Sequence, residues 1–123
     1  MIQMESMWYF ISPTEPTENG TMTASIQVPP TSLWFSGHFP GFPVLPGIAQ
    51  LAMAADTVRQ ALGNGVRVAG FRRVRFKRMI RPGDDLVVVV TALPRSAEAF
   101  AFRIMAGEDL VCSGTIDLDK KGE

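Results

Sequence analysis

The sequence predicts an α+β fold in which an antiparallel sheet wraps around one long helix. One stretch, residues 46–62, has apolar residues at helical spacing, whereas after Gly65 the apolar residues tend to recur at every second position. Short turn sequences separate the strands of this second part, as they do in hairpins. A single helix combined with hairpin-linked strands favours an antiparallel α+β sheet.

The predicted helix begins near Pro46 and ends near Leu62. Proline suits the first helical turn, and the sequence Gly63-Asn64-Gly65 is a strong stop signal. The residues that recur at helical spacing, and that we expect on the apolar face, are Ile48, Leu51, Ala52, Ala55, Val58 and Leu62. Because much of this face is alanine, another group can approach the helix backbone closely.

Five to six strands are predicted around this helix. They span residues 7–12, 21–28, 66–80, 86–93, 97–105 and 110–118. The longest, residues 66–80, is expected to bend near Gly70. Residues 82–84 and 107–109 are predicted turns. A sheet of this size leaves open edges, which favours self-association.

Length and composition limit the possible functions. The 123 residues are expected to form one domain, residues 1–123. Twelve Lys and Arg balance twelve Asp and Glu, so the net charge favours neither nucleic acid nor an anionic membrane. With one cysteine, Cys112, and one histidine, His38, we expect neither an internal disulfide nor a metal site, and Cys112 is expected to be a buried apolar residue. No signal peptide or membrane span is predicted, so we expect a cytoplasmic protein.

A loop at residues 31–47 precedes the helix and contains prolines at a spacing of three, which exclude a helix or a central strand. Its aromatic residues give it apolar area to bury, so we expect a rigid, packed loop of a kind that often carries function. The loop contains His38, whose side chain titrates near neutral pH. It leads into the free amides of Gly47 and Ile48, which can bind a carbonyl or an oxyanion. A base beside such donors suits proton removal next to a carbonyl, although a single loop histidine is more often structural than catalytic.

The pattern H-F-P-G-x-P-x-x-P-G at residues 38–47, followed by a helix, resembles the signature of the β-hydroxyacyl-acyl-carrier-protein dehydratases of bacterial fatty-acid synthesis. The run at residues 76–84, which ends in Pro-Gly-Asp, is similar to a second motif of this family, and residues 110–118 match its closing strand in position. The resemblance covers residues 21–118. It implies the hot-dog fold, in which a sheet wraps around one central helix.

The resemblance also implies a reaction and roles for individual residues. His38 would take the α-proton of a 3-hydroxyacyl thioester, and the amide of Gly47 would bind the thioester carbonyl, so that a 2-enoyl thioester and water are formed. The residues expected to contact the substrate are Phe39, Pro46, Ile48 and Ala52. The substrate would be carried on the phosphopantetheine of an acyl carrier protein or on coenzyme A, with no further cofactor.

Ala52 departs from the pattern of the family, which places Glu or Asp five residues beyond the last glycine of the motif to assist departure of the 3-hydroxyl group. Loss of a general acid typically costs about 10²–10⁴-fold in rate. Asp56, one turn further on, would replace it only in a rearranged pocket, and its preferred interpretation is a surface or interface carboxylate near Arg59. Gln50 lies on a different side of the helix and cannot act as an acid.

Three functions stay open at this point. The first is a dehydratase that uses His38 with another or a water-mediated acid. The second is a thioester-binding subunit with little activity of its own, paired with an active paralogue. The third is an acyl thioesterase, which Ala52 also disfavours, because thioesterases of this fold usually place a carboxylate near the same helix.

Seven of the twelve basic residues lie between positions 67 and 81, with no acidic residue among them. The run is interpreted either as a solvated edge that resists aggregation or as a dock for an acidic acyl carrier protein, with Arg78 and Arg81 as binding residues. The resemblance further implies at least a homodimer whose strands pair across the interface.

Overall fold

The computed structural model describes residues 4–6, 9–13, 20–29, 47–63, 65–81, 83–94 and 98–119. These residues contain one helix, α1 (Gly47–Leu62), and seven strands: β1 (Met4–Ser6), β2 (Tyr9–Pro13), β3 (Thr21–Gln27), β4 (Arg67–Phe76), β5 (Asp85–Ala92), β6 (Ala99–Ala106) and β7 (Asp109–Asp119). Across this described part of the chain, no helical segment has the length and hydropathy that a bilayer crossing requires.

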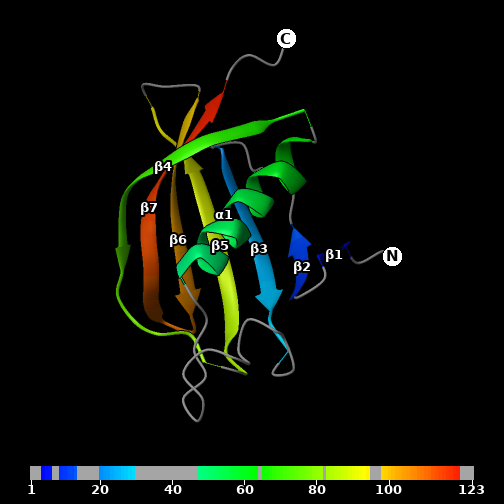
Figure 1. Ribbon diagram of the computed structural model, residues 1–123, viewed down its shortest axis with the longest axis vertical. Helices are drawn as coiled ribbons and strands as arrows, with labels where there is room; N and C mark the ends of the chain where they lie inside the picture. The colour runs from blue at the N-terminus through cyan, green and yellow to red at the C-terminus, as the bar shows by residue number, and fades with distance from the viewer. Residues whose placement is uncertain are drawn as a thin grey trace.

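All seven strands form one antiparallel sheet, and α1 lies across one face of it (Figure 1). The strand order is β1-β2-β3-β5-β6-β7-β4, so the strand that follows the helix lies at the opposite edge from the strands that precede it. The helix contacts β2 to β6. The prediction of an α+β fold with a sheet around one long helix is therefore confirmed.

The helix begins and ends within one residue of its predicted limits, and its buried face agrees with the prediction in part. Ala55 and Val58 are buried as predicted, whereas Ile48 and Leu62 are 68% and 42% exposed and Ala52 is exposed as well. The prediction was wrong for these exposed residues because no charged residue precedes Asp56 in the helix, so that the spacing of apolar residues did not select one side. The buried residues are Ala49, Gln50, Met53, Ala54, Ala55, Thr57 and Val58.

Strands β3, β5, β6 and β7 lie within two residues of their predicted positions. The first predicted strand, residues 7–12, overlaps β2, and the structure adds β1, which pairs with β2. The strand predicted at residues 66–80 ends at Phe76. Beyond it, Asp84 accepts hydrogen bonds from the Arg81 amide (3.0 Å) and from the guanidinium of Arg78 (3.2 Å), and these bonds stabilise a turn instead of a longer strand.

The edge strand β4 is irregular along its length. Its register against β7 shifts between Val68 and Gly70 and again between Arg72 and Arg75. Arg73, inside the second irregularity, has a φ of 55°, which is uncommon for a residue with a side chain. The first shift coincides with the bend predicted near Gly70. Bulges of this kind interrupt a flat edge, which protects it from uncontrolled pairing.

Phe102 lies in the core on the helix-facing side of the sheet and is 1% exposed. Its ring is edge-on to that of Phe71, with ring centres 6.0 Å apart and an interplanar angle of 82°. Gly114 pairs with Phe102 across β6 and β7. A Cβ at Gly114 would lie 2.8 Å from Phe102 Cε2 and 3.2 Å from the carbonyl oxygen of Arg72. Phe102 therefore occupies the space that a side chain at position 114 would need.

We expect Gly114→Ala to lower the free energy of unfolding by about 1–3 kcal/mol, because the added methyl group overpacks the Phe102 site. Gly70→Ala is the matched control, since a Cβ at Gly70 meets no atom within 4 Å. Urea denaturation of the two variants measures the difference. Equal stability of the two variants would contradict this account of the core.

Candidate functional site

The first turn of α1 is the candidate site, and it is partly exposed. Gly47 is the first residue of the helix, and Ile48 beside it is 68% exposed. The first amides of a helix have no intrahelical acceptor. The first turn contains no acidic side chain, so none of its own side chains neutralises the positive end of the helix dipole. This end of α1 is therefore suited to bind a carbonyl oxygen or an anion.

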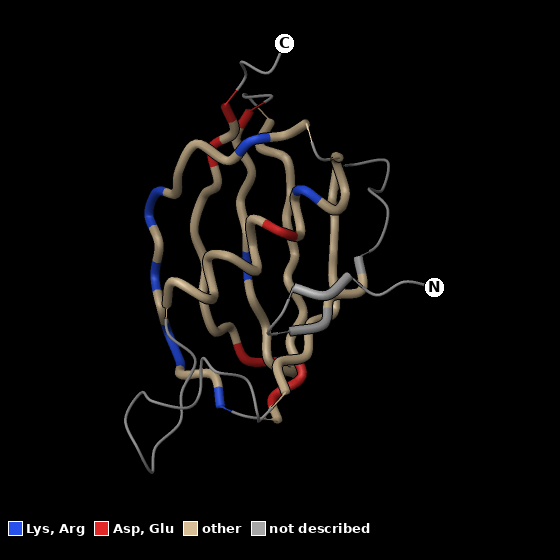
Figure 2. Tube along the Cα trace, turned by 45° about the vertical axis from the view of Figure 1, so that its right-hand side comes forward, with Lys and Arg blue, Asp and Glu red and all other residues tan. Residues whose placement is uncertain are grey.

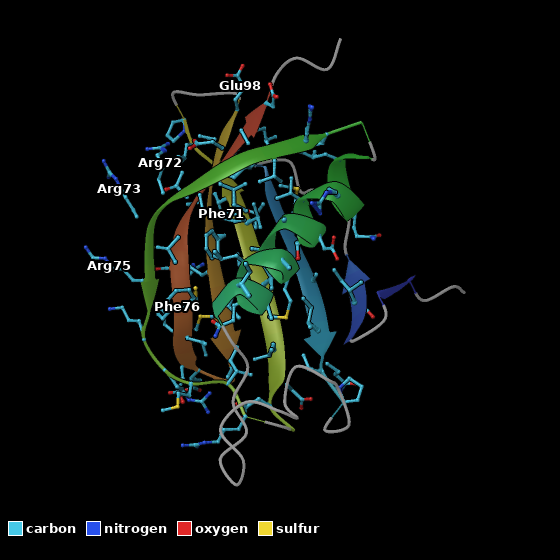
Figure 3. All side chains as sticks on the ribbon, viewed as in Figure 1. Phe71, Arg72, Arg73, Arg75, Phe76 and Glu98 are labelled. Carbon is cyan, nitrogen blue, oxygen red and sulfur yellow. The ribbon has the colours of Figure 1, made fainter. Side chains whose placement is uncertain are left out.

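The ring of Phe76, at the end of β4, lies against this turn (Figure 3). A Cβ at Gly47 would lie 2.7 Å from Phe76 Cζ, closer than side-chain carbons approach one another. Phe76 is nevertheless 52% exposed. Phe76 lies inside the second motif, at residues 76–84, and no role was predicted for it, because nothing in the spacing shows that residues 47 and 76 meet.

Ala52 and Ile48 lie one helical turn apart, and both are exposed. Gln50 is only 3% exposed, so the structure places it on a different side of the helix from Ala52, as predicted. Asp56 accepts a hydrogen bond from Arg59 at 2.9 Å, within an ion pair. This pairing supports the interpretation of Asp56 as a surface carboxylate over its use as a replacement acid.

Three of the predicted site residues, His38, Phe39 and Pro46, lie outside the described residues, as does the loop at residues 31–46. Their roles stay predictions. The structure brings Gly47 together with Phe76 and leaves Ile48 and Ala52 exposed on the helix surface.

Cys112 pairs with Phe76 in the ladder between β4 and β7 and is fully buried. Burial raises the pKa of its thiol to about 11. The thiol is therefore protonated near neutral pH and is a poor nucleophile toward a thioester. Its predicted interpretation as a buried apolar residue is confirmed.

The fold brings acidic partners to three residues of the basic run, two of them through the register of β4 against β7. Arg67 pairs with Asp119 at 3.9 Å and Arg72 with Asp117 at 2.6 Å. Arg78 lies 3.2 Å from Asp84 and 3.6 Å from Asp109. Within the described ranges, the ion pairs do not use Arg73, Arg75, Lys77 or Arg81, which are exposed. Figure 2 shows the basic positions following the β4 edge and the segment after it.

A cavity of about 520 Å³ is lined by residues other than those of the candidate site, and they include Arg72, Glu98, Asp117 and Leu118. The two hydrogen bonds between Arg72 and Asp117 lower the pKa of the Asp117 carboxyl and raise the pKa of Arg72. Because Arg72 and Asp117 neutralise each other, neither of them is a free charge that could bind a ligand in the cavity. None of its lining residues comes from α1.

Comparison with known proteins assigns the family. The family model described as "ApeI-like: ApeI dehydratase" matches residues 14–115, which include the 38–47 motif, α1 and strands β3 to β6. The chain belongs to the ApeI-like dehydratase family. The resemblance to hot-dog dehydratases seen in the sequence is confirmed by this match.

Two curated relatives of the ApeI-like chain are 3-hydroxyacyl-[acyl-carrier-protein] dehydratases named FabZ. The protein from Syntrophomonas wolfei is 36% identical in an alignment 90 positions long that covers 66% of this chain and 62% of that protein. The protein from Clostridioides difficile is 36% identical in an alignment 92 positions long that covers 68% of this chain and 65% of that protein. The ApeI-like chain thus spans slightly less than two thirds of the length of these relatives.

Solved structures agree with the predicted hot-dog fold. The dehydratase heterocomplex ApeI:P from Xenorhabdus doucetiae aligns over 98% of the ApeI-like chain and 100% of its own, with a TM-score of 0.76 and 24% identity. An uncharacterized protein from Erwinia carotovora aligns over 91% of this chain and 93% of its own, with a TM-score of 0.70 and 29% identity. The fold prediction is therefore confirmed.

We expect the free energy of unfolding of the ApeI-like chain to fall between pH 9 and pH 11, because the Cys112 thiol ionises near its ordinary pKa of 9.0 in the unfolded chain and near 11 in the folded one. In this window the unfolded chain binds fewer protons, so stability falls as the pH rises. Two pKa units correspond to about 2–3 kcal/mol. Urea denaturation across the window measures the loss, and Cys112→Ala is expected to lack this part of it. Parallel profiles for the two proteins would contradict the assignment.

Proposed function

We propose that this chain is a dehydratase that removes water from a 3-hydroxyacyl thioester and gives a 2-enoyl thioester. The family match and the FabZ relatives support the proposal. The observation that carries it is the position of Gly47. The glycine that ends the motif is the first residue of α1, where its amide has no intrahelical acceptor and is available to a carbonyl oxygen.

In this proposal, His38 removes a proton from the carbon next to the thioester carbonyl. The electron pair moves onto the carbonyl oxygen, which accepts a hydrogen bond from the Gly47 amide. The electrons then return to form the carbon–carbon double bond, and the 3-hydroxyl leaves as water after taking up a proton. Because Ala52 has no acidic group, protonated His38 returns this proton through a water molecule.

The reaction consists of proton transfers and the breaking of one carbon–oxygen bond, so we propose that it needs no further cofactor. We propose the phosphopantetheine of an acyl carrier protein as the carrier of the substrate, with coenzyme A as the alternative. The names of the FabZ relatives, which specify acyl-carrier-protein substrates, support the first of these.

The alternative is a thioester-binding subunit that completes its site with a different hot-dog chain. One observation favours it over the thioesterase. Ala52 is exposed on α1, so that a second chain can bring an acid to it. The Xenorhabdus structure is, by its title, a heterocomplex.

For the dehydratase itself we propose at least a homodimer. β4 is an edge of the sheet in the described chain. Met79, in the segment that follows, is 47% exposed, and a large exposed apolar side chain of this kind is a candidate for burial by a second copy. A cytoplasmic location is also part of the proposal, and it rests on the sequence alone.

We expect His38→Ala to lower the dehydration rate by about 10²–10⁴-fold without unfolding the protein, because it removes the base. Ala52→Glu is expected to raise the rate, since it restores the acid that the family places there. Formation of the 2-enoyl product from a 3-hydroxyacyl thioester measures both variants, and thermal denaturation checks their folding.

The combination of outcomes separates the functions. An inactive wild type with an active Ala52→Glu variant identifies the thioester-binding subunit. A fast wild type that is unaffected by Ala52→Glu supports return of the proton through His38. Release of free thiol from an acyl thioester, without enoyl product, would identify the thioesterase and contradict the proposal.

The carrier protein is proposed to dock on the basic surface formed by Arg75, Lys77, Arg78 and Arg81. We expect Arg75→Glu combined with Arg81→Glu to weaken binding of an acyl carrier protein at low salt by about tenfold and to flatten its salt dependence. Arg78 is left intact because it is bound to Asp84 in the turn. Calorimetric titration measures the affinity.

Arg67→Glu, at the far end of the same strand, is the control for this experiment, and we expect it to bind the carrier like the wild type. Unchanged affinity in the double variant would contradict the docking proposal and support the interpretation of the basic run as a solvated edge. Sedimentation of each protein checks that its oligomeric state is unaltered.

The same measurement tests the proposed dimer. A wild type that remains a monomer at micromolar concentration would contradict it.

A further inference from the structure

We propose that Phe76 is a positioning residue for the thioester carbonyl: its ring holds Gly47 in place and forms an apolar wall beside the Gly47 amide. This inference rests on the proposed function, because it concerns the same amide. It assigns a role to a residue of β4 that lies outside both the 38–47 motif and the helix.

The contact between the ring and the first turn of α1 is close. A Cβ at Gly47 would lie 2.7 Å from Cζ, 3.1 Å from Cε1 and 3.2 Å from Cε2 of Phe76. These three atoms form the outer end of the ring, so Phe76 points its end at the Cα of Gly47. Because the ring already fills this space, Gly47 cannot carry a side chain unless the ring or the start of the helix moves.

The backbone around Phe76 is fixed by the sheet. Phe76 pairs with Cys112 of β7, which is fully buried, and the amide of Lys77 donates a hydrogen bond to the carbonyl of Val111 at 2.7 Å. Figure 3 shows Phe76 on the helix side of β4, whereas Arg73 and Arg75 extend away from the helix. The ladder between β4 and β7 therefore determines where the ring meets the helix.

The exposure of Phe76 is what gives the contact a function beyond packing. A ring that served only the core would be covered, as Phe102 is, but Phe76 is 52% exposed. A thioester whose carbonyl binds the Gly47 amide would cover the exposed part of the ring and displace water, and a hydrogen bond is stronger where water is excluded.

Two consequences distinguish this role from that of an acyl-chain pocket. The ring lies beside the carbonyl end of the substrate, so its loss affects short and long acyl chains equally. The cost of a methyl group at position 47 comes from the ring, so this cost disappears when the ring is removed.

The test compares wild type, Phe76→Ala, Gly47→Ala and the double variant, with Phe71→Leu as the control. Phe71 lies on the same strand but packs against Phe102. The values of kcat and KM are measured for each protein with 3-hydroxybutyryl- and 3-hydroxydecanoyl-pantetheine. The affinity for the same two thioesters is measured after His38→Ala has been added to each protein. Thermal denaturation reports the folding of each variant.

We expect Phe76→Ala to lower kcat/KM by about tenfold for both substrates, and Gly47→Ala to lower it by about 10²-fold, since a displacement of about 1 Å near the reacting atoms costs this much. The double variant is expected to match Phe76→Ala, about tenfold above Gly47→Ala alone. Phe71→Leu is expected to lower the unfolding midpoint while leaving kcat/KM within about twofold of wild type, because its contacts lie in the core.

Additive losses in the double variant, a wild-type kcat/KM in Phe76→Ala, or a loss confined to the long-chain substrate would each overturn the proposal. A wild type that binds the thioesters without dehydrating them contradicts the proposed function alone, and the same comparison then applies to the dissociation constants. A wild type that binds neither thioester contradicts both.

Discussion

The close packing of α1 on the sheet determines the rest of the structure. Three of its buried residues, Ala49, Ala54 and Ala55, end at a methyl group, so the helix axis can approach the strands, and Met53 and Val58 fill the remaining space. A helix this close reaches from β2 across to β4. Its first turn thereby comes within contact distance of the end of β4, where the candidate site lies.

The architecture could be predicted because its signals are local. The helical spacing in residues 46–62, the stop at Gly63 and the alternation after Gly65 each depend on neighbouring residues, and the limits of α1 and of four strands agree with them. The buried face of α1 was predicted only in part in this way, correctly at Ala55 and Val58. Its first nine residues contain no charge, so only the shape of the sheet selects Ala49 and Met53 for the core and leaves Ala52 outside.

The candidate site likewise combines features that the sequence predicts with features that it does not predict. Gly47 follows from a motif within ten residues, but its contact with Phe76 joins positions 29 residues apart and requires the path of the chain between them. The basic run contains no acidic residue in the sequence, yet the register of β4 against β7 brings Asp117 and Asp119 to two of its arginines. Local sequence patterns therefore did not predict the interactions between segments that are distant in the chain.

The position of β4 has a consequence for the order in which the chain folds. Its only partner among the described strands is β7, and the pairing of Arg67 with Asp119 joins residues 52 positions apart. During synthesis, β4 is complete long before β7 emerges, so for that interval both of its edges lack a partner. Pairing at such a separation is intrinsically slow. The arginines of β4 are present before β7 is made, so we expect the charges that line the edge of the finished sheet to protect the nascent chain from aggregation as well.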